Sequence, residues 1–293
     1  MTDRPRFPHL ARFSRETGIS EDKLVSAFEI EQAFHTRIVS EDDPARRRDL
    51  YREVYETVHP IYGEDDSDPR RGEGGKERFA HLFRREIEGR SILDVGCGAG
   101  DFLRSVARRA AHGRLVGLDI STPVLPRDAQ GIEFVNGDVV RFDLGDPFDV
   151  VLSDNLVEHV APADLPAHFE SLRRALKTGG TLIVMAPSRL FGPCDVTRIV
   201  DCSYTNRVAA RGTHLSETTY GELIVGLGKF GFARFRTVCP IPKVRFLFAW
   251  WRMSPAPLCW VERHMSLIRL LHRVQLRGRC VFRLDVTLIA RAV

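Results

Sequence analysis

The sequence predicts an α/β protein with a doubly wound, seven-stranded sheet that is mostly parallel, its last strand being antiparallel. Two observations predict this fold. From residue 91 onward, short apolar runs typical of buried strands alternate with segments of helical periodicity. The first strand runs into a glycine-rich turn at 96–100 and then into an amphipathic helix. Such alternation favours parallel strands joined by right-handed crossovers, with helices on both faces of the sheet.

Before the first strand, residues 1–75 form an expected helical extension. Ser20-Glu21-Asp22 is expected to open a helix that runs to about Thr36, and apolar periodicity predicts a second helix over 44–58. A stretch rich in charge, glycine and proline then predicts a loop over 63–75. The extension is a candidate lid over the site, although core packing explains its tyrosines equally well: Tyr51, Tyr55 and Tyr62.

The main domain is expected to comprise residues 76–239 together with 281–293. After a helix over 76–88, apolar runs predict strands at 91–95, 114–119, 132–135, 148–153, 181–186, 232–238 and 281–290. Helices are predicted at 101–111, 164–177 and 217–230. The intervening residues 240–280 are too long for a simple connection and predict a helical insertion before the last strand.

The bulk composition excludes several classes of protein. Of the 293 residues, 43% are hydrophobic and 28% are charged, as in ordinary soluble proteins. The net charge of +4 is too small to indicate a nucleic-acid partner. The six cysteines form no C-x-x-C pair, so we expect neither a metal site nor a disulfide framework. We expect a monomer or a homodimer.

The apolar segments indicate a cytoplasmic location. The first residues lack the apolar stretch of a secretory signal, and no apolar run reaches the roughly 18 residues of a membrane span. Peripheral contact with the inner face of the membrane stays open because of the composition of 240–280. This segment holds Trp250, Trp251 and Trp260 and many arginines against one acid, Glu262. A basic, tryptophan-rich stretch fits an anionic membrane, a cap over a greasy substrate, or a dimer face.

The glycine turn predicts a site for an adenosine-bearing cofactor. Glycines at 96, 98 and 100 let the backbone approach a ligand, and the following helix presents free N–H groups to it. The spacing is G-x-G-x-G, so Asp101 replaces the third glycine of a dinucleotide site. Asp94 would repel a pyrophosphate and attract the α-ammonium group of S-adenosylmethionine (SAM). Asp119 ends the second strand, where it can accept the ribose hydroxyls.

Three segments carry a family resemblance. D-V-G-C-G-A-G at 94–100 resembles the first motif of the class I SAM-dependent methyltransferases. The residues from Phe148 to Val160 are similar to the F-D-x-V…L-E-H-V segment of the small-molecule members. K-T-G-G at 177–180 resembles their K-P-G-G turn, with threonine in place of proline. The resemblance covers about residues 77 to 238 and implies SAM as the cofactor.

The resemblance also assigns cofactor contacts, which it implies at the following residues: Asp94, Gly96, Cys97, Gly98 and Gly100 at the methionyl end, Asp119 at the ribose, Ile120, Asp138 and Val139 around the adenine, and Asp154 and Asn155 along the pocket. Two alternatives stay open. Asp119 also fits a solvated loop, and the N-G-D sequence that ends at Asp138 also fits an ordinary turn.

Methyl transfer depends mainly on positioning, but a hydroxyl acceptor must also lose its proton to a base. His159 lies nearest the methyl donor by motif position, and His214 lies just before a helix that Ser216 is expected to cap. We take these two histidines as the catalytic candidates, with His59 a weaker one, although capping or packing roles also fit. The loop over 187–215 offers arginines to an anionic acceptor: Arg189, Arg198, Arg207 and Arg211.

The sequence thus predicts methyl transfer to a small-molecule acceptor, with the oxygen of a hydrophobic, lipid-linked or glycan-linked hydroxyl as the preferred atom. Nitrogen and carbon acceptors are the alternatives within the family. Two alternatives come from other classes: a non-catalytic, membrane-associated SAM-binding partner and an NAD-dependent oxidoreductase. Asp94 and the missing third glycine argue against the oxidoreductase.

Overall fold

The computed structural model describes residues 6–62, 73–121, 131–203, 208–241, 244–276, 279–280 and 285–293. The helices are α1 (Leu10–Thr17), α2 (Glu21–Ser40), α3 (Pro44–Tyr62), α4 (Glu73–Leu82), α5 (Arg84–Ile87), α6 (Asp101–Arg109), α7 (Leu165–Arg174), α8 (Tyr220–Gly228), α9 (Ala256–Glu262) and α10 (Met265–Arg273). Short 3₁₀ helices are η2 (Val157–His159), η3 (Arg189–Phe191) and η4 (Val196–Ile199). The strands are β1 (Arg90–Val95), β2 (His112–Asp119), β3 (Glu133–Asn136), β4 (Phe148–Asp154), β5 (Leu176–Ala186), β6 (Phe232–Thr237), β7 (Gln275–Leu276), β8 (Arg279–Cys280) and β9 (Val286–Ala292).

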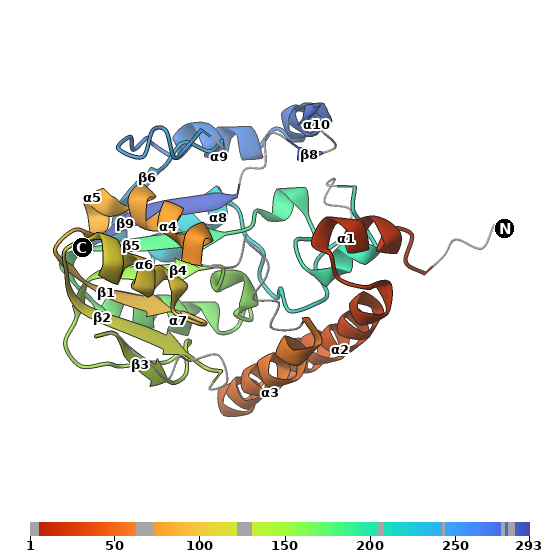
Figure 1. Ribbon diagram of the computed structural model, residues 1–293, viewed down its shortest axis with the longest axis horizontal. Coiled ribbons are helices and arrows are strands. Elements are labelled where there is room, and N and C mark those ends of the chain that lie inside the picture. Colours follow the sequence, from red (N-terminus) through yellow and green to blue (C-terminus); the bar gives the residue numbers. More distant parts are fainter. Residues whose placement is uncertain are drawn as a thin grey trace.

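Seven strands form one sheet in the order β3-β2-β1-β4-β5-β9-β6 (Figure 1). Strand β9 lies between β5 and β6 and is antiparallel to both, whereas the pairs β1–β2, β1–β4, β2–β3 and β4–β5 are parallel. The predicted mixed sheet with an antiparallel last strand is therefore confirmed. Strands β7 and β8 form a separate two-stranded ladder.

Alternating side chains of the central strand pack on opposite faces of the sheet, as expected for a strand buried on both sides. On β1, Ile92 lies in the cluster built with α4 and α6, which includes Phe102. Leu93 lies in the opposite cluster with residues of α7 and α8, which include Leu172 and Leu223. Both faces are thus covered by helices (Figure 1).

Helices α2 and α3 lie beyond the arrowheads of the parallel strands, at the carboxyl edge of the sheet (Figure 1). A buried ion pair joins α3 to the sheet domain. Arg47 Nε donates to Asp164 Oδ2 at 2.6 Å, and Arg47 Nη2 donates to Asp164 Oδ1 at 2.9 Å. The Tyr51 hydroxyl donates to Asp164 at 2.9 Å and accepts from the Ala161 N–H at 2.9 Å. The N-terminal helices are therefore fixed over the strand ends.

Several predicted helices differ from the structure. The helices expected to end near 36 and at 58 extend to Ser40 and Tyr62, and the helix expected over 164–177 ends at Arg174 because Leu176 begins β5. The helix expected over 76–88 is two helices, α4 and α5, divided at Phe83, whose side chain is fully buried. The helix expected from 217 begins at Tyr220, and its N-cap is Thr219 rather than Ser216. Thr219 and Glu222 form a reciprocal capping box, which satisfies two helix-terminal N–H groups, while Ser216 N donates to the Glu158 carbonyl.

The predicted insertion over 240–280 contains α9, α10 and the β7–β8 ladder, and α9 packs against α8. It is anchored by Leu258 and Ile268, which are buried in the core. Glu262, the acid of this segment, accepts the Tyr220 and Gly221 N–H groups at 2.7 and 3.0 Å. Across the described ranges, none of the helices combines the length and apolarity that crossing a membrane requires.

Candidate cofactor and acceptor site

The glycine turn has the backbone conformation that the sequence predicts. Gly96, Gly98 and Gly100 all have positive φ, at 74°, 52° and 76°, where other residues are strained. A Cβ on Gly96 would also lie 3.0 Å from the Leu156 side chain. The N–H groups of Gly96 and Cys97 donate to the Leu118 carbonyl, which ties the turn to β2. Burial raises the pKa of the Cys97 thiol, so this cysteine stays protonated.

Three predicted carboxylates lie at the ends of neighbouring strands, Asp119 on β2, Asp94 on β1 and Asp154 on β4. Asp119 accepts the Gly98 N–H and the Ser121 N–H, both at 2.9 Å. Asp94 is 3% exposed. Burial raises the pKa of Asp94 to about 8, and the charges of Asp154 and Asp119 act in the same direction. This edge of the sheet is therefore strongly acidic.

Lys76, a residue that sequence reasoning missed, places its ammonium group among these acids. Its Nζ donates to Asp154 Oδ2. Burial acts to lower the pKa of Lys76, but the charges of Asp154 and Asp94 outweigh it and raise the pKa. Lys76 could not be predicted, because no sequence motif connects a lysine of α4 with acids at the ends of later strands. The three acids outnumber this one lysine, so the pocket suits a cationic cofactor and disfavours a pyrophosphate.

The residues assigned to the adenine and to the pocket wall lie around the same edge. Asp138 Oδ1 accepts the Val140 N–H at 2.7 Å, which is the local turn that the N-G-D sequence also allowed. Ile120 and Val139 are 5% and 6% exposed and belong to different core clusters. Asn155 has a φ of 51°, and its Nδ2 donates to Asp154 at 2.9 Å. Adenine binding by Asp138, Ile120 and Val139 stays a prediction.

The structure brings the two candidate histidines together. His159 ends η2, after β4, and His214 lies in the loop before α8. Their ring centroids are 4.8 Å apart in an edge-to-face arrangement. The ring of Tyr55, from α3, lies 5.8 Å from the His159 ring on centroid distance. The side chain of the weaker candidate, His59, lies outside the described residues.

Opposite electrostatic environments act on the two rings. Burial lowers the pKa of His159 to about 3, and the charge of His214 acts in the same direction. Burial also acts to lower the pKa of His214, but Glu217 and nearby carboxylates raise it to about 9. At neutral pH, therefore, an unprotonated His159 lies beside a positively charged His214. Burial raises the pKa of the adjacent Glu158 to about 7.

Helix α2 closes the acceptor side and holds the loop of His214. Glu31 accepts the Thr213 N–H at 2.9 Å and the Tyr62 hydroxyl, and His35 Nδ1 donates to the Gly212 carbonyl at 2.9 Å. Burial raises the pKa of Glu31 to about 7. Glu31 and His35 were not predicted, because the apolar periodicity of α2 does not mark polar residues on its buried face. A small cavity here is lined by Glu31, Phe34, His35, Ile38, Tyr51, Val54, Tyr55, His159, Gly212, Thr213 and Leu215.

Two of the four arginines expected to receive an anionic acceptor are held in ion pairs within the protein. Arg189 pairs with Glu222. Arg198 pairs with Glu16 at 2.7 Å, and its guanidinium lies 4.9 Å from the centroid of a phenylalanine ring. Their positive charges are thus already compensated. Arg207 lies outside the described residues.

Comparison with known proteins agrees with this geometry. A methyltransferase domain family matches residues 92–180. Ubiquinone biosynthesis O-methyltransferases from Chelativorans sp. and Azorhizobium caulinodans are 32% identical over 150 residues and 34% identical over 169 residues. These alignments cover 48% and 53% of this chain, and 55% and 64% of the relatives, so the chain spans little more than half of their length.

Among solved structures, the cyclase SpnF has a TM-score of 0.53 at 17% identity, with 84% of this chain and 96% of SpnF covered. This likeness concerns the fold, because a shared fold does not determine activity. The seven-stranded order, the glycine turn and the matched family agree on one assignment. Residues 92–180 match a methyltransferase domain family, and with the sheet order and the glycine turn they support a class I SAM-dependent methyltransferase domain, whose cofactor is S-adenosylmethionine.

Proposed function

We propose that this protein transfers the methyl group of SAM to a hydroxyl oxygen of a small, hydrophobic acceptor. The observation that carries the proposal is the pair formed by His159 and His214, beside the acidic edge at Asp94 and Asp154. The pair combines a nitrogen that can accept a proton with a positive charge that can face a developing oxyanion. The names of the O-methyltransferase relatives support oxygen as the acceptor atom.

The reaction proposed is an in-line displacement. The acceptor oxygen forms a bond to the methyl carbon, the bond from that carbon to sulfur breaks, and its electron pair stays on sulfur. His159 is a weak base with its low pKa, so it takes the proton as the bond to the methyl carbon forms and makes that proton strongly acidic. The proton passes to Nε2, which is unprotonated because Nδ1 carries the hydrogen that bonds the Thr213 carbonyl at 3.0 Å. The charge of His214 then stabilises the oxygen as it loses its proton.

The surroundings of the pair support a hydrophobic acceptor. Phe34, Tyr55 and Leu215 are among the side chains around the pair, and the cavity that they line under α2 and α3 measures about 10 Å³. Lipid-linked and glycan-linked hydroxyl compounds are the acceptor classes proposed from the sequence. We also propose that the 240–280 segment contacts the membrane surface peripherally, which would give the site access to a greasy acceptor.

Calorimetric titration with S-adenosylhomocysteine, with NAD as a parallel ligand, tests the cofactor. We expect S-adenosylhomocysteine to bind, and Asp119→Asn to weaken that binding by about 10-fold to 100-fold, since a charged acceptor of hydrogen bonds is lost. Asp143→Asn is the matched control, because Asp143 accepts a local N–H in a surface turn away from the strand ends. Binding of NAD alone would overturn the proposal.

A screen of hydroxylated aromatic and lipid-linked acceptors with methyl-labelled SAM then tests the reaction. We expect a methyl ether as product, and a loss of about 100-fold or more in kcat for His159→Gln while S-adenosylhomocysteine still binds. Transfer to nitrogen or carbon, with His159→Gln as active as the parent protein, would exclude the proposed chemistry.

A further inference from the structure

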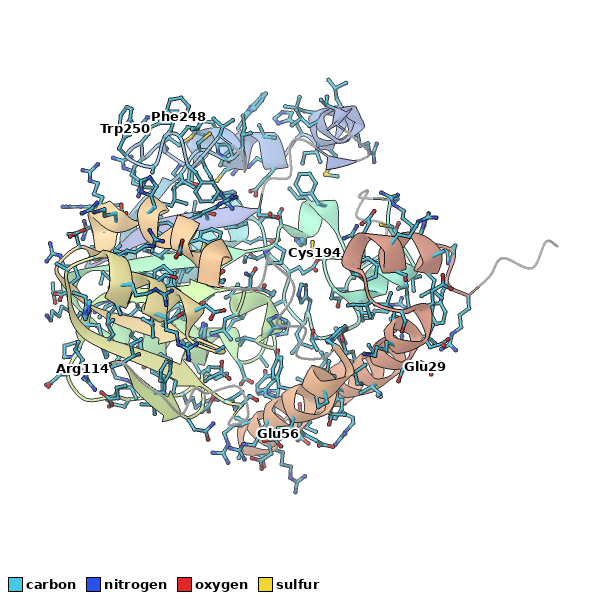
Figure 2. All side chains as sticks on the ribbon, in the orientation of Figure 1. Glu29, Glu56, Arg114, Cys194, Phe248 and Trp250 are labelled. Atoms are coloured by element: carbon cyan, nitrogen blue, oxygen red, sulfur yellow. The ribbon has the colours of Figure 1, made fainter. Side chains whose placement is uncertain are left out.

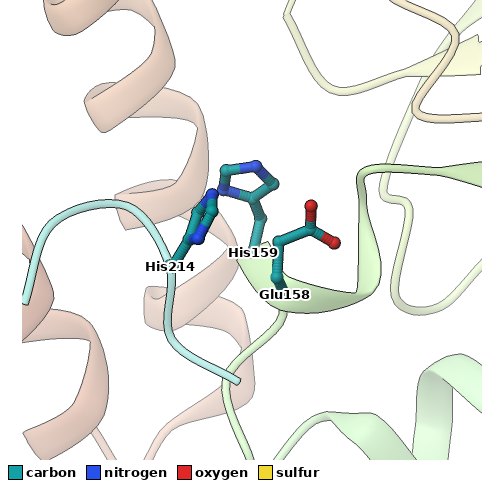
Figure 3. A group of neighbouring side chains, drawn as sticks. All are labelled: Glu158, His159 and His214. Atoms are coloured by element: carbon teal, nitrogen blue, oxygen red, sulfur yellow. The ribbon is translucent and has the colours of Figure 1, made fainter. Parts of the chain in front are cut away.

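Three side chains on the acceptor side are neighbours: Glu158, His159 and His214 (Figure 3). One potential ligand atom from each lies within 4.8 Å of the others. The first two residues are consecutive in η2, and the third comes from a distant loop. The N–H groups of Leu215 and Ser216 donate to the Glu158 carbonyl at 2.6 and 2.9 Å, so the loop is fixed against η2.

Both imidazole rings are oriented by a hydrogen bond from Nδ1. His159 Nδ1 donates to the Thr213 carbonyl at 3.0 Å, and His214 Nδ1 donates to Glu217 Oε1 at 2.7 Å. Glu217 Oε1 is itself held by the Cys194 N–H at 2.7 Å. Nε2 of each ring is left as the nitrogen available to a ligand. Metal-binding histidines typically bind the metal through one ring nitrogen and donate a hydrogen bond from the other to a carbonyl or a carboxylate.

Glu158 supplies an independent observation. This residue is 1% exposed, and its Oε2 is buried without a hydrogen-bond partner among the described residues. A buried carboxylate oxygen without a partner is unfavourable, and a bound cation would satisfy it. The carboxylate that carries this oxygen belongs to the same group of potential ligands as the two rings.

We propose that Glu158, His159 and His214 bind a divalent transition-metal ion such as Zn²⁺. Two imidazole nitrogens and one carboxylate oxygen form a donor set that suits zinc and its neighbours in the first transition row. Three protein ligands leave coordination positions open, as in metal sites that act on a substrate. The proposal departs from the expectation of no metal, which rested on cysteine spacing and could not detect ligands so far apart in the sequence.

The open positions would lie beside the small acceptor cavity, because His159 also lines that cavity. With the ion bound, Nε2 of His159 would be a ligand and could not accept the proton. The ion would instead bind the acceptor hydroxyl and lower its pKa, the proton would pass to water, and the ion would take over the positive charge that His214 supplies without metal. This role rests on the proposed function, whereas metal binding itself can be measured without any acceptor.

The test uses the full chain, stripped with a chelator and titrated with Zn²⁺ by calorimetry and with Co²⁺ by visible absorption. We expect one ion per chain, and a loss of affinity of about 100-fold or more in Glu158→Gln, His159→Gln and His214→Gln. Glu217→Gln should cost about 10-fold to 100-fold, because it removes the carboxylate that orients His214. His35→Gln is the control, since His35 holds the same loop from outside the group of ligands.

Binding of S-adenosylhomocysteine by each variant shows that it has folded. The proposal is overturned if the folded parent chain takes up no Zn²⁺ or Co²⁺, or if the three ligand substitutions weaken binding no more than His35→Gln. Stoichiometric binding that depends on these residues, in a protein that methylates no hydroxyl, would keep the metal site and reject the proposed function.

Discussion

Asp94 is a buried carboxyl group in a pocket proposed to hold a cationic cofactor, and its pKa of about 8 therefore links cofactor binding to pH. Below that pH, Asp94 is protonated in the free protein. Contact with the α-ammonium group favours the ionised form, so binding releases a proton. The affinity for S-adenosylhomocysteine should therefore rise between about pH 6 and about pH 8, by at most about 10-fold per pH unit.

Calorimetry at several pH values, in buffers of different ionisation enthalpy, measures both the affinity and the number of protons released. Asp94→Asn should flatten the pH dependence over this range, because an amide does not titrate. Affinity that falls as the pH rises, or an equal slope in Asp94→Asn, would contradict the assignment.

At the residue scale, the sequence predicted those site residues that belong to a recognisable sequence motif. The glycines and Asp94 belong to one motif, and His159 belongs to another. Lys76, Glu31 and Glu217 could not be predicted, because each reaches the site from an element whose place depends on tertiary packing. His214 was predicted as a catalytic candidate, with a helix-entry role as the alternative, but its contact with His159 came from the structure.

At the scale of elements, the attachment of α3 depends on Arg47, which is 4% exposed and paired with Asp164. Removing one partner leaves the other buried without full charge compensation. We expect Arg47→Ala to lower the free energy of unfolding by about 3 kcal/mol. Arg48→Ala, one residue further along α3, should change it by less than about 1 kcal/mol, since Arg48 pairs with Asp49 at the surface.

Urea denaturation of the two variants measures this difference. A loss of stability as large in Arg48→Ala as in Arg47→Ala would show that the buried pair is not what holds α3. The pair also explains why Tyr51 is a packing residue rather than a mobile lid residue, since its hydroxyl is committed to Asp164 and Ala161.

The sequence signals that predict where a helix begins were clear for α2 and ambiguous for α8. Ser20 was expected to open α2, and its hydroxyl accepts the Lys23 N–H, because an N-cap acts on its own neighbours. The start of α8 was misplaced because Ser216 and Thr219 both suit an N-cap, and the choice depended on Glu222 and on the distant Glu158 carbonyl. Local chemistry alone does not decide between such candidates.

At the scale of the whole molecule, most of the exposed large apolar side chains among the described residues belong to one segment, here called the 244–274 surface: Leu247, Phe248, Trp250, Trp251, Trp260, Leu270 and Val274. Phe248 and Trp250 lie at the outer edge of the molecule, above the sheet (Figure 2). Trp250 is 69% exposed and Trp260 is 58% exposed, so packing against the core does not account for them. Exposed tryptophans on a basic segment favour an anionic membrane surface.

All three tryptophans of the chain belong to this surface, so intrinsic fluorescence reports on it alone. We expect a blue shift with vesicles of anionic lipid, a weaker one with zwitterionic vesicles, and a reversal by salt. Trp250→Ser with Trp251→Ser should reduce co-sedimentation by about 10-fold or more. Val225→Ser is the control, because Val225 is an exposed apolar residue on α8.

Equal binding of the double variant and the control would exclude a membrane role for this surface. A blue shift that depends on protein concentration and needs no lipid would identify a dimer face instead. The sequence indicated the composition of this segment but not its exposure, since tryptophans buried in a cap and tryptophans facing solvent have the same pattern.

The position of β9 in the sheet bears on how the chain folds. Among the described residues, β9 is the strand of the sheet that pairs with β6, and β9 pairs across more than a hundred residues with β5, as in Thr181 with Arg291. Until residues 286–292 are synthesised and inserted, β5 and β6 each present an open edge to other chains. Such late, non-local closure slows folding and lengthens the exposure of those edges. During synthesis, we therefore expect this protein to depend on chaperones that shield unpaired strands until the final strand arrives.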